Sequence, residues 1–380
     1  MKEEGILKRI SAITGIDRLV EKLALLSQKD WQSLLLYAFE ERAGRLSVNH
    51  LLDQVHNSRF TQPSALSQRA IVGLEHNAIN LLPQEFEAIE LSPVVPFGTN
   101  RILAGTNQKN ILSTSRNLEV TADPTTALAL ECARRRSQLI RNSSTVANPV
   151  RLATIQRNIR LQSFEKIPGF MPHFKVLALE TAGCEKPDWP FKIASLLEHL
   201  TYYLRFICFL IKSGYHFQGV IVNISNIRIA EKIIQNKGLS RKEVGRETQN
   251  SAFSIFEAAG ISFPSIVSDL RVLDVESQFN YGIKYFIDAL KEVEEAIVTP
   301  MKSNIPDIYW EFDLERIAGM GYYTDLCFKI TAKNRLGYTY PLIDGGFVDW
   351  TQKLLLSKKE QLLISGVGLD ILLQNFHERV

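Results

Sequence analysis

"PVRLATIQRNIRLQSF" (residues 149–164), followed by "HFKVLALETAG" (residues 173–183), is the stretch that decides the fold of this chain. Both segments have the composition of strands, and the loop that joins them covers residues 165–172. "DPTTALALECARRRSQLIR" (residues 123–141) precedes them and predicts a helix, because Asp123 is placed to cap it and Pro124 takes its first position.

Short β-rich runs lie before this helix, and a second β-rich section lies near the end of the chain. The early runs are "AIELSPVV" (88–95), "RILAG" (101–105), "NILSTS" (110–115) and "LEVTA" (118–122). The late runs are "IYWEFDLERIAG" (308–319), "YYTDLCFKITA" (322–332), "GYTYPLIDGG" (337–346) and "EQLLISGVG" (360–368), with a final helix from about Leu369. Helices between them, including the long "WPFKIASLLEHLTYYLRFICFLIKSG" (189–214), predict an α+β fold with a mostly antiparallel sheet flanked by helices.

Residues 1–75 read as a small helical N-terminal domain, separate from a core over residues 76–380. "DWQSLLLYAFEERAG" (30–44) combines an expected cap at Asp30, an apolar face and a closing Gly44.

Composition describes an ordinary globular protein. Of the 380 residues, 45% are hydrophobic and 22% charged, and the net charge of +3 indicates neither a nucleic-acid nor a membrane partner. The four cysteines have no metal-binding or CxxC spacing, the start has no apolar signal region, and "FICFLI" (206–211) is too short for a membrane span. We expect a cytoplasmic protein without a metal site; no phosphate-binding loop or hydrolase motif is visible.

Three stretches, taken in order, carry a resemblance to a known family. They are "EVTADPTTALAL", the strand pair above, and "FDLERIAGMGYYTDLCFKI" with "LIDGGFVDW" and "ISGVGLDILL". The series resembles the catalytic core of histidyl-tRNA synthetase and its paralogue, the regulatory subunit of ATP phosphoribosyltransferase, both of the class II synthetase fold. The likeness covers roughly residues 75–380 and implies a class II core with no anticodon-binding domain.

The resemblance implies an amino-acid site. "TADPT" places Asp123 and Thr125 where the family holds the α-ammonium group, and Arg160 where a motif 2 arginine faces the phosphate and carboxylate. Gln162 stands at an acidic position of that motif, and Glu180 at the residue that contacts the imidazole. The alternatives are a simple helix cap for Asp123, an exposed strand residue for Arg160 and a surface carboxylate for Glu180.

"AGMGYYTDLCF" (318–328) resembles the histidine-specific motif, with Tyr322 and Tyr323 in the tyrosine positions. "DGGFVDW" similarly keeps Gly345 and Gly346 of a glycine-rich signature. Val176 stands where the family normally has a glutamine, so the resemblance implies that one α-ammonium contact is missing here.

Two family arginines are replaced, one by Ala318 and one by Ile371. Losing one well-placed donor costs about 3–4 kcal/mol of transition-state stabilisation, so the double loss argues against aminoacyl-adenylate chemistry. We therefore expect a catalytically degenerate protein, with no catalytic residues and no cofactor, that binds histidine or a similar amino acid in a regulatory role. It would report binding to a protein partner rather than act on tRNA.

Two other hypotheses stay open. An ATP-dependent ligase could use Arg160 in a rearranged site, and only this alternative requires ATP and Mg²⁺. A purely structural subunit would use none of these residues. Under every hypothesis "RAIVGLEHNAINLLPQEFEAIELSP" with Pro93 resembles the motif that forms the class II dimer interface, so we expect a homodimer.

Overall fold

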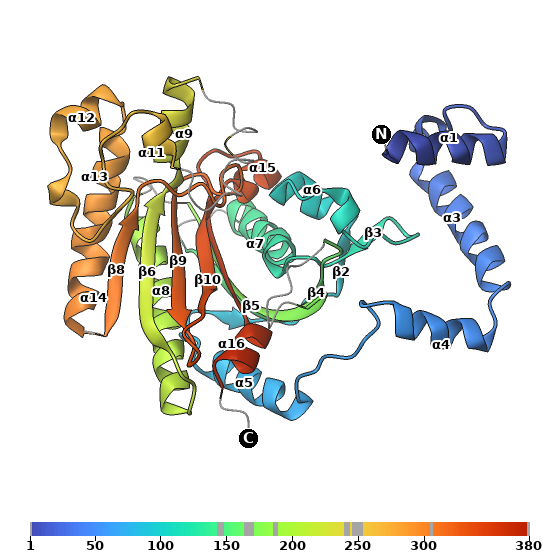
Figure 1. Ribbon diagram of the computed structural model, residues 1–380, viewed down its shortest axis with the longest axis horizontal. Coiled ribbons are helices and arrows are strands. Elements are labelled where there is room, and N and C mark those ends of the chain that lie inside the picture. The colour runs from blue at the N-terminus through green and yellow to red at the C-terminus, as the bar shows by residue number, and fades with distance from the viewer. Residues whose placement is uncertain are drawn as a thin grey trace.

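The computed structural model describes residues 2–142, 148–162, 171–184, 189–238, 244, 254–304 and 307–377. Its described strands form one nine-stranded sheet and a separate two-stranded ribbon (Figure 1). In spatial order the sheet contains β1 (Glu87–Ala88), β4 (Val150–Ile159), β5 (His173–Gly183), β11 (Gln361–Gly368), β10 (Thr339–Val348), β9 (Leu326–Lys333), β6 (Gln218–Asn226), β8 (Ile308–Asp313) and β7 (Ile266–Val267).

Neighbouring described strands are antiparallel except for the pairs β1–β4 and β6–β8. The predicted α+β class and mostly antiparallel sheet are confirmed. The strand pair predicted over residues 149–164 and 173–183 forms β4 and β5, paired from Val150↔Ala182 to Ile159↔His173. β11 lies between β5 and β10 and joins the two halves of the sheet.

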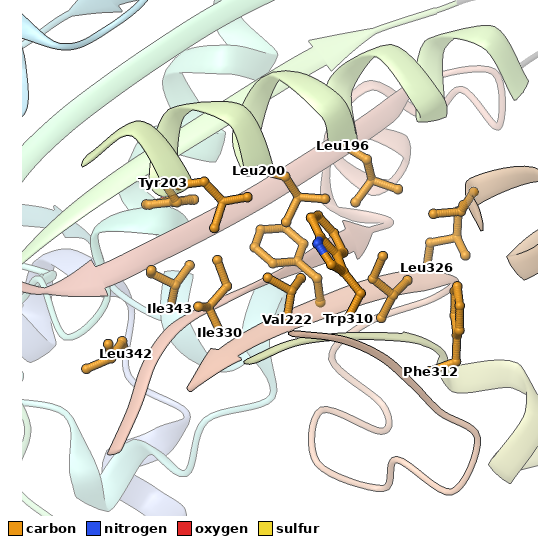
Figure 2. Close-up of a cluster of buried hydrophobic side chains, with 14 of the residues drawn as sticks. Leu196, Leu200, Tyr203, Val222, Trp310, Phe312, Leu326, Ile330, Leu342 and Ile343 are labelled. Carbon is orange, nitrogen blue, oxygen red and sulfur yellow. The ribbon is translucent and has the colours of Figure 1, made fainter. Parts of the chain in front are cut away.

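Helix α8 (Trp189–Lys212) covers one face of the sheet. Its Leu196, Leu200 and Tyr203 pack in a large buried cluster with side chains of β6, β8, β9 and β10, as Figure 2 shows. Among the described residues it is the one helix with the length and hydropathy of a membrane span, yet 56% of its most apolar window is buried inside the protein.

Helix α7 (Pro124–Arg141) covers the opposite face of the sheet. Its Leu128 and Cys132 pack with Leu152 of β4 and Ile364 of β11 in a second buried cluster. As predicted, Asp123 caps the helix, since its side chain accepts a hydrogen bond from the backbone N–H of Thr125. Pro124 occupies the first helical position.

Shorter elements complete the core. The ribbon pairs β2 (Val94–Pro96) with β3 (Leu118–Val120). The remaining described core helices are α5 (Gln68–Asn80), α6 (Thr99–Ala104), α9 (Ile227–Asn236), α11 (Ile255–Ala258), α12 (Val275–Asn280), α13 (Lys284–Val293), α14 (Thr299–Asn304), α15 (Trp350–Leu355) and α16 (Leu369–Asn375). Single turns η1 (Gln108–Asn110), η2 (Leu270–Val272) and η3 (Glu294–Val298) lie between them.

Some local predictions are wrong. "RILAG" lies in α6 instead of a strand, because the buried Glu119 carboxylate accepts hydrogen bonds of 2.9 Å from the backbone N–H groups of Gly98 and Asn100 at the start of that helix. "NILSTS" is not a strand and makes one isolated bridge, Ser113↔Glu119. The strand expected from Tyr322 begins at Leu326, so both tyrosines lie in the preceding turn.

The N-terminal segment is helical, as expected, and packs little. It contains α1 (Lys2–Thr14), α2 (Leu19–Ala24), α3 (Gln28–Ala43) and α4 (Val48–Asn57). None of residues 5–57 is buried, and Figure 1 shows α1, α3 and α4 beside the core rather than on the sheet. The cap of α3 is Ser27, not Asp30, which lies in the first turn. The boundary expected at residue 75 falls inside α5, whose Ile71 and Leu74 join the core cluster.

Candidate functional site

A cavity of about 440 Å³ opens where the start of α7, the end of β4, the start of β5, the turn before β9 and the start of α16 meet, and parts of β10 and β11 also line it. This volume suits a small molecule. Six of the residues predicted for the site line the cavity: Asp123, Thr125, Arg160, Gln162, Tyr322 and Tyr323. Val176, Asp344, Asp370 and Ile371 are also part of the lining.

Asp123 and Arg160 form an ion pair at this cavity. The Arg160 Nη2 donates to Asp123 Oδ2 at 3.1 Å, and its Nε donates to the carbonyl of Ala122 at 2.9 Å. The other carboxylate oxygen of Asp123 accepts from the N–H and the hydroxyl of Thr125, at 3.0 and 2.8 Å. The Arg160 guanidinium also lies 5.3 Å from the centre of the Phe174 ring, which fixes its plane. Asp123 thus caps a helix and presents a carboxylate to the cavity.

Two tyrosines form another part of the cavity wall. The Tyr322 hydroxyl lies 3.3 Å from the Thr125 hydroxyl, and its ring meets that of Tyr323 edge-on at 5.0 Å. Gly319 makes this wall possible: its φ is +94°, and a Cβ there would lie 2.5 Å from the Tyr323 ring. Gly346 does the same from β10, since its Cβ would lie 2.7 Å from that ring.

Arg316 supports the cavity wall from behind and was not predicted from the sequence. It is buried, and its Nη2 donates to Asp344 at 2.6 Å while its Nε donates to the carbonyl of Ala318 at 2.9 Å. Its guanidinium carbon lies 5.4 Å from the centre of the Tyr323 ring. A cation therefore lies behind the cavity wall, two residues before the position where the family has its arginine, but Arg316 is not among the lining residues. The only signal in the sequence was an arginine at that offset.

Glu180 lies beneath the cavity, outside its lining. It is fully buried, and no nitrogen or oxygen atom of the described residues donates a hydrogen bond to either carboxyl oxygen. Burial raises its pKa well above the ordinary value, the charge of Asp123 adds to the rise, and the Cys132 thiol opposes it. Burial thus favours the neutral form of this carboxyl group under the cavity, and the surface-carboxylate alternative is wrong.

Gly345 is also outside the lining, as is Gly346. A Cβ at Gly345 would lie 2.6 Å from both Phe328 and Ser365, so this glycine allows close packing of its neighbours. A ligand contact by either glycine or by Glu180 stays a prediction.

The other end of the cavity carries Asp370 at the start of α16. This buried carboxylate accepts a 2.6 Å hydrogen bond from the backbone N–H of Lys175, and Arg157 Nη1 lies 3.9 Å from its second oxygen. Burial raises the pKa of Asp370, and the contacts with Lys175 and Arg157 oppose that rise. The neighbouring Ile371, which replaces a family arginine, presents only hydrocarbon to the cavity.

The geometry matches the charges of a zwitterion. Asp123 offers acceptors for an ammonium group, and Arg160, within 3.1 Å of it, offers donors for a carboxylate. Among the described residues, no group of three or more His, Cys, Asp or Glu side chains could hold a metal ion.

Comparison with known proteins identifies the fold. No family model and no curated protein matches the sequence. Solved structures do match. One is titled an ATP phosphoribosyltransferase regulatory subunit/histidyl-tRNA synthetase from Bacillus halodurans, with TM-score 0.58 and 18% identity over 84% of this chain and 83% of that chain.

Two further solved structures agree with the first. A histidine–tRNA ligase subunit from Alicyclobacillus acidocaldarius gives TM-score 0.59 and 12% identity over 82% of this chain and 96% of that one. A histidyl-tRNA synthetase from Nostoc gives 0.56 and 16% over 82% and 72%. The chain therefore has a class II synthetase-like fold of the histidyl-tRNA synthetase type, as the sequence predicted.

Proposed function

We propose that this protein binds a free amino acid, with histidine as the first candidate, and that binding serves a regulatory role. The observation that carries the proposal is the Asp123–Arg160 pair at the cavity, with a distance of 3.1 Å between Oδ2 and Nη2. An amino acid can replace this internal pair by two external ones, ammonium to Asp123 and carboxylate to Arg160. Because the exchange conserves charge pairing, the apo protein is not left with an isolated charge.

Histidine is the first candidate because the solved structures of the same fold carry names of histidine-specific proteins. The cavity also offers polar groups to a side chain deeper inside it, namely the hydroxyls of Thr125 and Tyr322, 3.3 Å apart. An imidazole can both donate to and accept from such hydroxyls.

Adenylation is disfavoured by the cavity's composition. Ala318 and Ile371 replace two family arginines, and the nearby Arg316 is committed to Asp344 and the Ala318 carbonyl. The transfer of a nucleotidyl group needs several positive groups at the reacting phosphate. We further propose that the protein is a cytoplasmic homodimer and that it signals to a protein partner.

Calorimetric titration with the twenty amino acids tests the proposal. We expect one of them, histidine first, to bind the wild type, and Asp123→Asn and Arg160→Met to weaken binding on the order of tenfold or more, since each removes a charge-assisted contact. Asn still caps helices, so Asp123→Asn separates ligand binding from capping. Asp53→Asn, on the exposed α4, is the matched control.

Silence for all twenty amino acids would refute the proposal, as would unchanged affinity in Asp123→Asn. Release of pyrophosphate from ATP that depends on the amino acid and is abolished by Arg160→Ala would instead identify the ligase.

A further inference from the structure

Residues 58–67, which connect α4 to α5, lie against the rim of the cavity. Arg59 Nη2 donates to the backbone carbonyls of Leu161 and Gln162, at 3.0 and 2.9 Å. The carbonyl of Gln62 accepts a 2.8 Å hydrogen bond from His173 Nε2. These contacts join segments about one hundred residues apart in the chain.

A second contact reaches the cavity lining from the same connector. The Ser64 hydroxyl lies 3.9 Å from the sulfur of Met171, within the range of a weak hydrogen bond to a thioether. Met171 and Gln162 both line the cavity. The connector therefore holds the described rim at two places, one after β4 and one before β5.

The rim after β4 needs such support. β4 ends at Ile159, so residues 160–162 have left the strand ladder while Arg160 and Gln162 still face the cavity. Their N–H groups are held by other loops: Arg160 donates to Pro172 at 3.1 Å and Leu161 donates to Asn110 at 3.0 Å. The carbonyls of Leu161 and Gln162 are held by Arg59, whose planar guanidinium can bond two acceptors at once.

We propose that Arg59 is a positioning residue for the amino-acid site and that it couples the connector after α4 to ligand binding. The inference rests on the proposed function, because its coupling partner is the ligand held by Arg160. Coupling between two sites is reciprocal. If the ligand stabilises the hydrogen bonds of Arg59 through Arg160, those hydrogen bonds also stabilise the bound ligand. Loss of Arg59 should therefore weaken ligand binding by a corresponding factor.

The test compares full-length Arg59→Ala with Arg45→Ala, which removes an arginine of the same N-terminal segment whose side chain is 79% exposed. Hydrogen exchange without ligand comes first. We expect the amides of residues 160–161 to exchange severalfold faster in Arg59→Ala than in the wild type, and unchanged in Arg45→Ala. Equal exchange in all three proteins overturns the proposal, whether or not any amino acid binds.

Ligand binding is then measured with histidine as the probe. We expect Arg59→Ala to bind at least fivefold more weakly, Arg59→Lys to fall between it and the wild type because an ammonium lacks the planar fork, and Arg45→Ala to bind normally. Saturating histidine should slow exchange of residues 58–64 in the wild type only. Equal affinity in Arg59→Ala and the wild type refutes the coupling. A wild type that binds no amino acid refutes the proposed function, and the hydrogen-exchange result alone then decides whether Arg59 positions the rim.

Discussion

The guanidinium of Arg316 lies 5.4 Å from the centre of the Tyr323 ring, on the buried side of the cavity wall. One side chain therefore fixes three parts of that wall: the tyrosine, the carbonyl of Ala318 and the carboxylate of Asp344. The turn that carries Ala318, where the resemblance would place an arginine, still depends on an arginine for its shape.

Arg316→Met should loosen this wall. The variant loses the ion pair to Asp344, whose side chain is 53% exposed, so the cost is discounted from that of a fully buried pair to about 1–3 kcal/mol of unfolding free energy. Urea denaturation measures the loss, and histidine titration should show weaker binding. Arg101→Met, on the exposed side of α6, is the control; equal midpoints for both variants would contradict the assignment.

Glu180→Gln should become more stable than the wild type as the pH rises. The folded pKa of Glu180 is raised, so above pH 4.5 the unfolded chain loses a proton that the folded protein keeps, and wild-type stability falls until the folded pKa is passed. Glutamine has no such proton. The difference should grow by about 1.4 kcal/mol per pH unit within that window and vanish near pH 4. Urea melts at several pH values give the slope; parallel curves for the two proteins would rule this out.

Glu360→Ala should lower the protein's free energy of unfolding by a large amount. Arg136 and Glu360 form a bidentate pair with two bonds of 2.9 Å, and both side chains are at most 1% exposed. Removing one partner leaves a buried charge and costs about 3–5 kcal/mol. Replacing both, as in Arg136→Met/Glu360→Leu, should cost less than Glu360→Ala alone. A double variant less stable than Glu360→Ala would contradict the prediction.

Gly346→Ala should damage the cavity from a position outside its lining, by displacing the lining residue Tyr323. The new Cβ would lie 2.6 Å from Cys327 Cβ and 2.7 Å from the Tyr323 ring, so the tyrosine must move, at a cost of about 1–3 kcal/mol. Gly73→Ala in α5 is the matched control, because nothing lies within 4 Å of its Cβ, and a helical alanine should stabilise by about 0.5–1 kcal/mol. Thermal melts and histidine titration distinguish the two; equal effects would refute the steric argument.

The sequence predicts those parts of the fold whose signals are local. The β4–β5 pair and helix α7 carry their own strand composition, cap and first-turn proline, and the structure has them as predicted. α6 was mistaken for a strand because its start is capped by Glu119, 19 residues away from Asn100, and no local pattern records that contact. Ser27 and Asp30 are both residue types that cap helices, so the sequence alone leaves the start of α3 ambiguous. In the structure Ser27 is the cap, and its hydroxyl also donates a 2.7 Å hydrogen bond to Asp30.

The site follows the same division. Asp123, Arg160 and the two tyrosines meet at one cavity. This could be predicted because the resemblance assigns each of them a place on a known element of the fold. The burial of Glu180 beneath the cavity could not be predicted, because it depends on how α7, which carries Cys132, packs against the sheet. The position of Arg316 could not be predicted either, because its hydrogen bonds to Asp344 and to the carbonyl of Ala318 depend on how the turn before β9 folds against β10.

The central place of β11 has a consequence for how the chain is made. β5 ends at Gly183 and β11 begins at Gln361, so at ribosomal speed the strand that joins the two half-sheets follows β5 by roughly 10–35 s. Until then β5 presents an open edge to other chains, and β10 does so for the short time between its own synthesis and that of β11. The nascent protein is therefore vulnerable to aggregation until β11 has left the ribosome. A chain truncated before Gln361 would leave the facing edges of β5 and β10 unpaired.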